Sequence, residues 1–130
     1  MAMFESGRIP TTEDIVSRAT ELGHLIARHS ATTAYREAVD ALEMDVDAQR
    51  LLTDYNRLVH ALAEKETKGG PIEVEEKHRL RESQSAMAMN PILSRMQVTQ
   101  MDYVDLMRKV ESAMAEAAGG ISGSADPAAI

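Results

Sequence analysis

The sequence predicts an all-α protein, an antiparallel helical bundle or hairpin of about five helices, two of them long. Two observations predict this fold class. Apolar residues recur at intervals of three and four, which is the spacing of one helix face, and no segment alternates polar and apolar residues over the length of a strand. Turn-forming residues divide the periodic segments, and connections of a few residues place successive helices antiparallel.

The first two helices are predicted in the N-terminal third of the chain, after a flexible leader over residues 1–10. Thr11 and Thr12 offer hydroxyl caps, and the acidic residues that follow suit the positive end of a helix. We expect the first helix over 12–29 and a shorter second helix over 32–43, divided by the sequence HSATTA. The apolar positions are Ile15, Ala19, Leu22 and Ile26 in the first helix and Tyr35, Ala38, Val39 and Leu42 in the second.

The third helix has the clearest apolar face. Asp45 or Asp47 can cap its start, and the sequence KGGP at 68–71 ends it, because Gly69 or Gly70 can adopt the left-handed cap conformation. Its apolar residues fall within an arc of about 120° and are Ala48, Leu51, Leu52, Tyr55, Leu58, Val59 and Leu62.

The last two helices are separated by Asn90 and Pro91. A fourth helix with a thinner apolar face is expected over 72–89, and a fifth from Asn90-Pro91 to about residue 118. Asparagine caps helices and proline is favoured at their first position, so this pair starts a helix as much as it ends one. The fifth helix can then leave at an angle to the fourth, which frees its apolar face: Leu93, Met96, Tyr103, Val104, Met107, Val110 and Met114.

Length and composition indicate a single helical domain over 11–118, followed by a disordered, Gly-rich tail over 119–130. With nine methionines, one phenylalanine and no tryptophan, the core or contact surface is expected to be aliphatic and adaptable in shape. The net charge of −7 argues against direct binding of nucleic acid. No apolar run suits a signal peptide or a membrane span, so we expect a cytoplasmic protein without membrane insertion.

Chemistry-bearing residues are few, and we predict neither enzymatic activity nor a cofactor. Two Glu-x-x-His pairs, Glu21 with His24 and Glu75 with His78, match a motif of di-iron helical bundles. Those ligands must point inward, whereas both pairs fall across their helices from the apolar positions. We therefore predict no metal site and no catalytic residue. The alternative function is an RNA-binding module that uses the basic cluster between Lys65 and Arg81, although acidic residues are interleaved with it.

The predicted function is instead protein binding through the long third and fifth helices, because apolar faces of that length commonly pair with another chain. Gln100 lies among the apolar positions of the fifth helix, where it either fixes the register of paired helices from a buried position or lies at the edge of the core. The predicted interface consists of Leu52, Tyr55, Val59, Leu62, Met96, Gln100, Tyr103, Met107 and Val110.

From about Ile15 to Val110 the sequence resembles the YlbF/YmcA family of small bacterial regulators. The likeness is strongest in NPILSRMQVTQMDYVDLMRKV, which begins at Asn90. Matching positions elsewhere include the apolar residues of the first helix, the glycine turn at Gly69, and Tyr35, Ala38, Asp45, Ala48, Leu51 and Tyr55. Met96 departs from the family pattern, which usually has an aromatic residue there.

This resemblance implies a non-enzymatic helical protein that forms homo-oligomers (dimers or larger) or complexes with paralogues. It also implies a regulatory role linked to competence, biofilm formation, sporulation and messenger-RNA maturation, the last as an adaptor in an endoribonuclease complex. Some members belong to a complex that carries iron–sulfur clusters. Thiolates hold such clusters, and this sequence has no cysteine, which sets it apart from that role.

Overall fold

The computed structural model describes residues 8–120, and within them it contains five helices and no strand. The predicted all-α fold class is therefore confirmed. Most of the predicted leader and most of the predicted tail, residues 1–7 and 121–130, lie outside the described residues. The helices are α1 (Thr12–Arg28), α2 (Ser30–Glu43), α3 (Val46–Thr67), α4 (Val74–Met89) and α5 (Pro91–Ala117).

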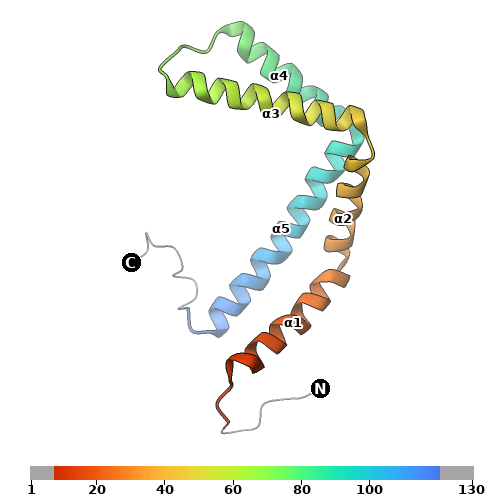
Figure 1. The fold of residues 1–130 in the computed structure, drawn as a ribbon, viewed down its shortest axis with the longest axis vertical. Helices are drawn as coiled ribbons and strands as arrows, with labels where there is room; N and C mark the ends of the chain where they lie inside the picture. The colour runs from red at the N-terminus through yellow and green to blue at the C-terminus, as the bar shows by residue number, and fades with distance from the viewer. Residues whose placement is uncertain (1–7, 121–130) are drawn as a thin grey trace.

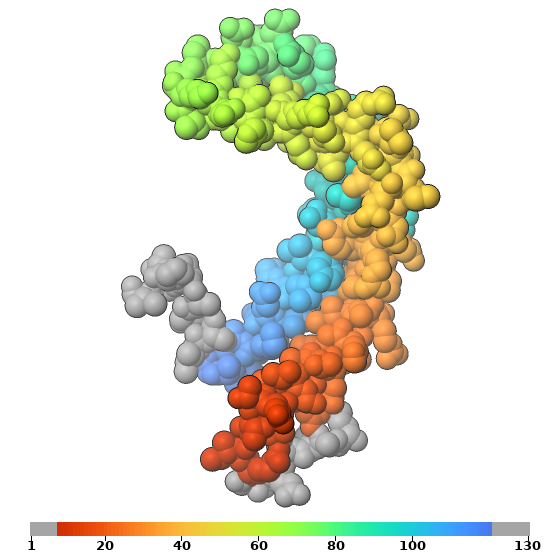
Figure 2. Space-filling view, viewed as in Figure 1, coloured from red at the N-terminus to blue at the C-terminus, as the bar shows by residue number. Residues whose placement is uncertain are grey.

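The helices form two antiparallel pairs that meet at an angle (Figure 1). One pair is α3 with α4, and the other is α2 with α5; α1 extends the line of α2 and packs against no other helix. The molecule is an elongated, bent body, hollowed on the inner side of the bend (Figure 2). None of the described helices is both long and apolar enough to cross a membrane.

Local side-chain caps start α1 and α3 where the sequence predicts them. The hydroxyl of Thr11 accepts a hydrogen bond from the Asp14 N–H (3.2 Å), and the Asp14 carboxylate accepts one from the Thr11 N–H (2.9 Å). At α3 the cap is Asp45, whose Oδ1 accepts from the Ala48 N–H at 2.8 Å. After α3 the backbone turns at Gly69, whose φ of 78° favours glycine.

Two helix starts differ from the prediction by two residues. α2 begins at Ser30 because the extended residue His29 both ends α1 and caps α2, with its Nδ1 accepting from the Ala31 N–H at 3.0 Å. α4 begins at Val74 because Glu73 is its N-cap residue, and the Glu73 N–H donates to the carboxylate one turn ahead at 3.0 Å. A single histidine is thus enough to divide the first two helices.

The buried core is small for a chain of this length. Its apolar members within residues 8–120 are Ala38, Ala48, Leu62 and Leu93, and no large side chain in this range is completely buried. The α2–α5 pair adds a stack of the Tyr35 and Tyr103 rings, with centroids 5.5 Å apart. Because so little apolar surface is buried within the chain, large apolar side chains remain exposed on several helices.

Candidate functional site at the bend

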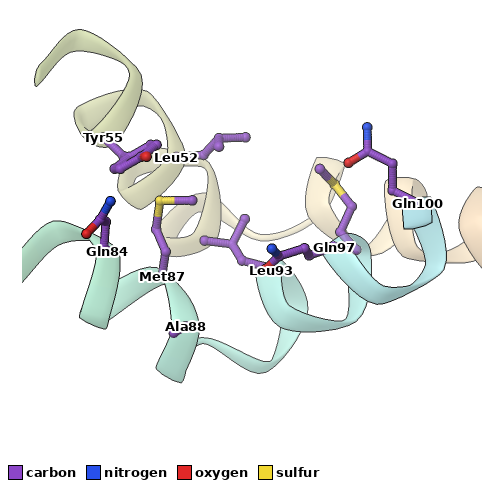
Figure 3. A pocket seen from close by; sticks show the side chains of 9 residues that line it. Leu52, Tyr55, Gln84, Met87, Ala88, Leu93, Gln97 and Gln100 are labelled. Atoms are coloured by element: carbon purple, nitrogen blue, oxygen red, sulfur yellow. The ribbon is translucent and has the colours of Figure 1, made fainter. Parts of the chain in front are cut away.

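A groove of about 460 Å³ lies where α3, α4 and α5 meet at the bend. Figure 3 shows Leu52 and Tyr55 reaching it from α3, Met87 from α4 and Leu93 from α5. Two methionines and three aliphatic residues make this surface apolar and adaptable in shape. The full lining is Leu52, Tyr55, Gln84, Met87, Ala88, Leu93, Met96, Gln97 and Gln100. We call this set the bend groove.

The Asn90-Pro91 break brings α4 and α5 residues into the bend groove. Asn90 Oδ1 accepts hydrogen bonds from the N–H groups of Ile92 (3.0 Å) and Leu93 (3.1 Å), and Pro91 is the first residue of α5. Asn90 itself is extended, with φ −82° and ψ 118°, so the helix axis changes direction there. As a result Met87 and Leu93, on successive helices, face the same groove (Figure 3).

The bend groove carries no charged side chain. Its polar members are three glutamines, of which Gln84 and Gln100 lie near opposite ends in Figure 3, and the phenol of Tyr55. All three glutamines are exposed residues. Neutral amides around an apolar floor offer hydrogen bonds and contact area to a protein surface. They supply no nucleophile or general base to a substrate.

The predicted interface residues fall into three groups. Leu52, Tyr55, Met96 and Gln100 line the bend groove. Leu62 is buried in the core, and Tyr103 stacks on the ring of Tyr35. The remaining members lie outside the groove lining, half-buried or just exposed: Val59, Met107 and Val110.

The structure places Gln100 at the edge of the core, the second of its two predicted positions. Its side chain is exposed, whereas the neighbouring Thr99 is buried and donates its hydroxyl proton towards the carbonyls of Arg95 (2.9 Å) and Met96 (3.1 Å). A register role that requires a buried Gln100 amide is therefore wrong within this chain.

A second apolar surface on α5 was only partly predicted from the sequence. Val98, Met101 and Val104 follow one another at intervals of three residues, and of these only Val104 belongs to the predicted apolar face. The exposed fractions of Val98 and Met101 are 57% and 65%. Val98 and Met101 lie across the helix from the expected apolar face at 100° per residue. The sequence did contain a signal for this surface, because apolar residues occur on both sides of one helix. This pattern is typical of helices that are buried on all sides.

The two Glu-x-x-His pairs lie on separate helices, α1 and α4, and all four side chains are exposed. His78 lies 3.1 Å from Glu82 on its own helix. Among residues 8–120 no three metal-binding side chains come together in a way that could hold an ion. The geometry thus places these residues on solvated faces.

Within the basic cluster between Lys65 and Arg81, one cation forms an ion pair that joins α3 to α4. Lys65 Nζ lies 2.6 Å from a Glu76 carboxylate oxygen, and this hydrogen bond lowers the pKa of Glu76 and raises that of Lys65. Lys77 and Arg81 are exposed and form no ion pair with any described residue. The cluster therefore retains cations on α4 that form no ion pair within the described residues, Lys77 and Arg81 among them.

Comparison with known proteins agrees with this fold. A chain in the X-ray crystal structure of Bacillus subtilis RicA in complex with RicF has a TM-score of 0.71 and 16% identity, covering 83% of this chain and 96% of that chain. A comparison with curated proteins found no match. The family described as control of competence regulator ComK, YlbF/YmcA, matches residues 15–117. The chain therefore belongs to the YlbF/YmcA family.

Proposed function

We propose that this protein is a non-enzymatic regulatory adaptor that binds other proteins at the bend groove. The observation that carries the proposal is the groove itself, an apolar surface rimmed by neutral amides at the junction of three helices. A surface of this kind gains most by excluding water against another apolar surface. On α5 the groove residue Gln100 also lines a neighbouring shallow surface with the exposed residues Met101 and Val104.

The comparisons support protein partners of the same family. RicA was crystallised with RicF, and a chain of that complex shares the fold of this protein. By analogy we propose that this chain assembles with itself or with related helical proteins. The proposal also includes a cytoplasmic location, a role in competence, biofilm formation or sporulation, and membership of an endoribonuclease complex. These further parts rest on the family alone.

The test is capture of partners by tagged protein in its native host, with the groove altered. Leu52→Ala/Met96→Ala removes two apolar contacts from the groove floor. The matched control, Met44→Ala/Met89→Ala, removes two exposed methionines that lie outside the groove. We expect specific proteins to be enriched with the wild type and the control and depleted at least about ten-fold with the groove variant, since a few central residues dominate interfaces.

Quantitative mass spectrometry of the captured proteins gives the result, and circular dichroism checks that each variant remains helical. If no protein is enriched over an untagged strain, or if both variants capture the same set equally, the bend groove is not the binding site.

A further inference from the structure

Every sulfur atom of this protein belongs to a methionine, because the sequence has nine methionines and no cysteine. A two-electron oxidant therefore finds no thiol, and the thioether is the side-chain group that it converts most readily. The product is methionine sulfoxide, which dedicated reductases convert back to methionine. What this conversion does to the protein depends on where each thioether lies.

Two of the methionines line the bend groove, Met87 from α4 and Met96 from α5. Figure 3 shows the Met87 side chain pointing toward Leu52 and Tyr55 of α3. Both methionines are half-buried, so they contribute apolar surface to the groove and still have contact with solvent. A small oxidant such as hydrogen peroxide can therefore reach them in the unbound protein.

Oxidation by hydrogen peroxide changes the polarity of these two side chains. A lone pair of the methionine sulfur attacks one peroxide oxygen, the O–O bond breaks and an S–O bond forms. After a proton transfer the second oxygen leaves as water. The sulfur loses two electrons, which the peroxide gains. The product carries a hydrogen-bond acceptor where the groove previously presented an apolar thioether.

A protein that covers the bend groove must remove water from these new oxygens. Burying a polar group costs free energy unless a hydrogen bond replaces its water, and an apolar partner surface offers no donor. In the unbound groove, by contrast, water or the amide of Gln84, one turn before Met87, can donate to the sulfoxide oxygen. Oxidation therefore favours the unbound, hydrated groove.

We propose that Met87 and Met96 are reversible oxidation sites, at which a peroxide turns off the binding of protein partners to the bend groove. The inference rests on the proposed function in one respect, that the bend groove binds protein. Met44 and Met89 provide the contrast, because they are 86% and 81% exposed and lie outside the groove. Their oxidation adds a polar atom at positions that are already in water.

The test compares partner capture before and after oxidation. Purified tagged protein is treated with hydrogen peroxide, the peroxide is removed with catalase, and the protein is incubated with an extract of the native host. The readout is the set of groove-dependent proteins, which untreated wild type captures and Leu52→Ala/Met96→Ala does not. Peptide mass spectrometry measures the sulfoxide fraction at each methionine before and after capture.

We expect capture of the groove-dependent proteins to fall at least about ten-fold once Met87 and Met96 are oxidised, because two polar groups must then be buried. Treatment with methionine sulfoxide reductases, one for each sulfoxide epimer, should restore capture to within about three-fold of the untreated level.

Three variants assign the effect to the groove methionines. Met87→Leu/Met96→Leu has apolar side chains that peroxide does not oxidise, so its capture should change less than about two-fold relative to its own untreated sample. The matched control, Met44→Leu/Met89→Leu, keeps the groove methionines and should lose capture on oxidation as the wild type does. Met87→Gln/Met96→Gln is polar without any oxidant and should capture as little as oxidised wild type. Circular dichroism checks that each variant remains helical.

A loss of capture that the reductases reverse, and that Met87→Leu/Met96→Leu resists, supports the proposal. Three outcomes overturn it: Met87 and Met96 stay unoxidised while Met44 and Met89 are oxidised, their oxidation leaves capture unchanged, or the leucine variant loses capture as strongly as wild type. In each of these cases, groove-dependent capture by untreated wild type leaves the proposed function standing. An untreated wild type that captures no groove-dependent protein would overturn the proposed function and this inference together.

Discussion

Lys65 and Glu76 show how one pair of residues holds the α3–α4 hairpin together. They are eleven residues apart, and Lys65 Nζ lies 2.6 Å from Glu76 Oε1 across the glycine turn. Glu76 also accepts a hydrogen bond from the Glu73 N–H. The hydrogen bond from Lys65 is the largest cause of the lowered pKa of Glu76, and the bond from Glu73 adds to it. One carboxylate thus both starts α4 and fastens it to α3.

The pKa direction gives a prediction for stability against pH. A glutamate whose pKa is lowered on folding stabilises the folded state above its unfolded pKa, and this stabilisation is lost as the pH falls through its folded pKa. We expect Glu76→Gln to lower the thermal unfolding midpoint at neutral pH. The difference from wild type should begin to shrink near the ordinary glutamate pKa of about 4.3, and it should vanish only once the pH lies below the lowered pKa of folded Glu76, where the wild-type carboxyl is protonated as well.

Circular dichroism melts across this pH range make the comparison. Glu75→Gln is the control, because Glu75 is exposed and carries no ion pair in the described structure. An unchanged midpoint for Glu76→Gln at neutral pH would mean that the pair contributes nothing measurable to the hairpin.

At the residue scale, the sequence could not decide whether the side chain of Gln100 is buried or lies at the edge of the core. Wheel angles place it among apolar residues of α5, but the helix packs on α2 with Thr99 buried and Gln100 exposed. Which side of a helix is covered depends on where the partner helix crosses it, and that is set by residues far away in sequence. The caps at Thr11, Asp45 and Asn90 were predictable because each acts within three residues of itself.

At the scale of elements, the break between α4 and α5 decides the shape of the bend groove. Asn90 caps α5 and the proline after it cannot donate the hydrogen bond that would continue α4. A helix running straight through this point would carry Met87 and Leu93 on one rod instead of directing both into the groove (Figure 3). The break is therefore part of the candidate site and more than a connector.

Replacing the break tests this account. Asn90→Ala removes a cap typically worth about 1 kcal/mol, and Pro91→Ala restores a backbone N–H. The double change should let α4 and α5 fuse, with helix content kept or raised. Partner capture and self-association should fall, because Met87 and Leu93 no longer converge. Circular dichroism reports the helix content, and sedimentation with pull-down reports binding. Assembly at wild-type levels in the double variant would reduce the break to a simple turn.

At the scale of the whole molecule, the bent arrangement leaves much of each helix uncovered within one chain. α1 packs only on α2, and α5 presents apolar residues on two sides. Helix number, order and approximate ends could be predicted from periodicity and caps. The angle between the helix pairs could not, because it depends on the Asn90 dihedral angles together with the packing of α3 against α2 and α5.

The surface at the bend was only partly predictable for the same reason. Periodicity placed Leu52, Tyr55 and Met96 on apolar faces, and these residues do line the groove. Gln84 and Gln97 were not among the predicted interface residues, since a polar side chain at a groove rim looks like any solvated position. The groove arises from three helices meeting, and no single stretch of sequence encodes it.

The central claim is that another protein chain covers the bend groove, and site-specific photo-crosslinking in the native host tests it most directly. A benzophenone amino acid replaces Gln100, an exposed residue at the groove rim, and in a control strain replaces Val74, an exposed residue outside the groove. The account predicts a light-dependent adduct, larger than the single chain, from position 100 and little or none from position 74. The absence of an adduct from position 100, or adducts of equal yield from both positions, would contradict it.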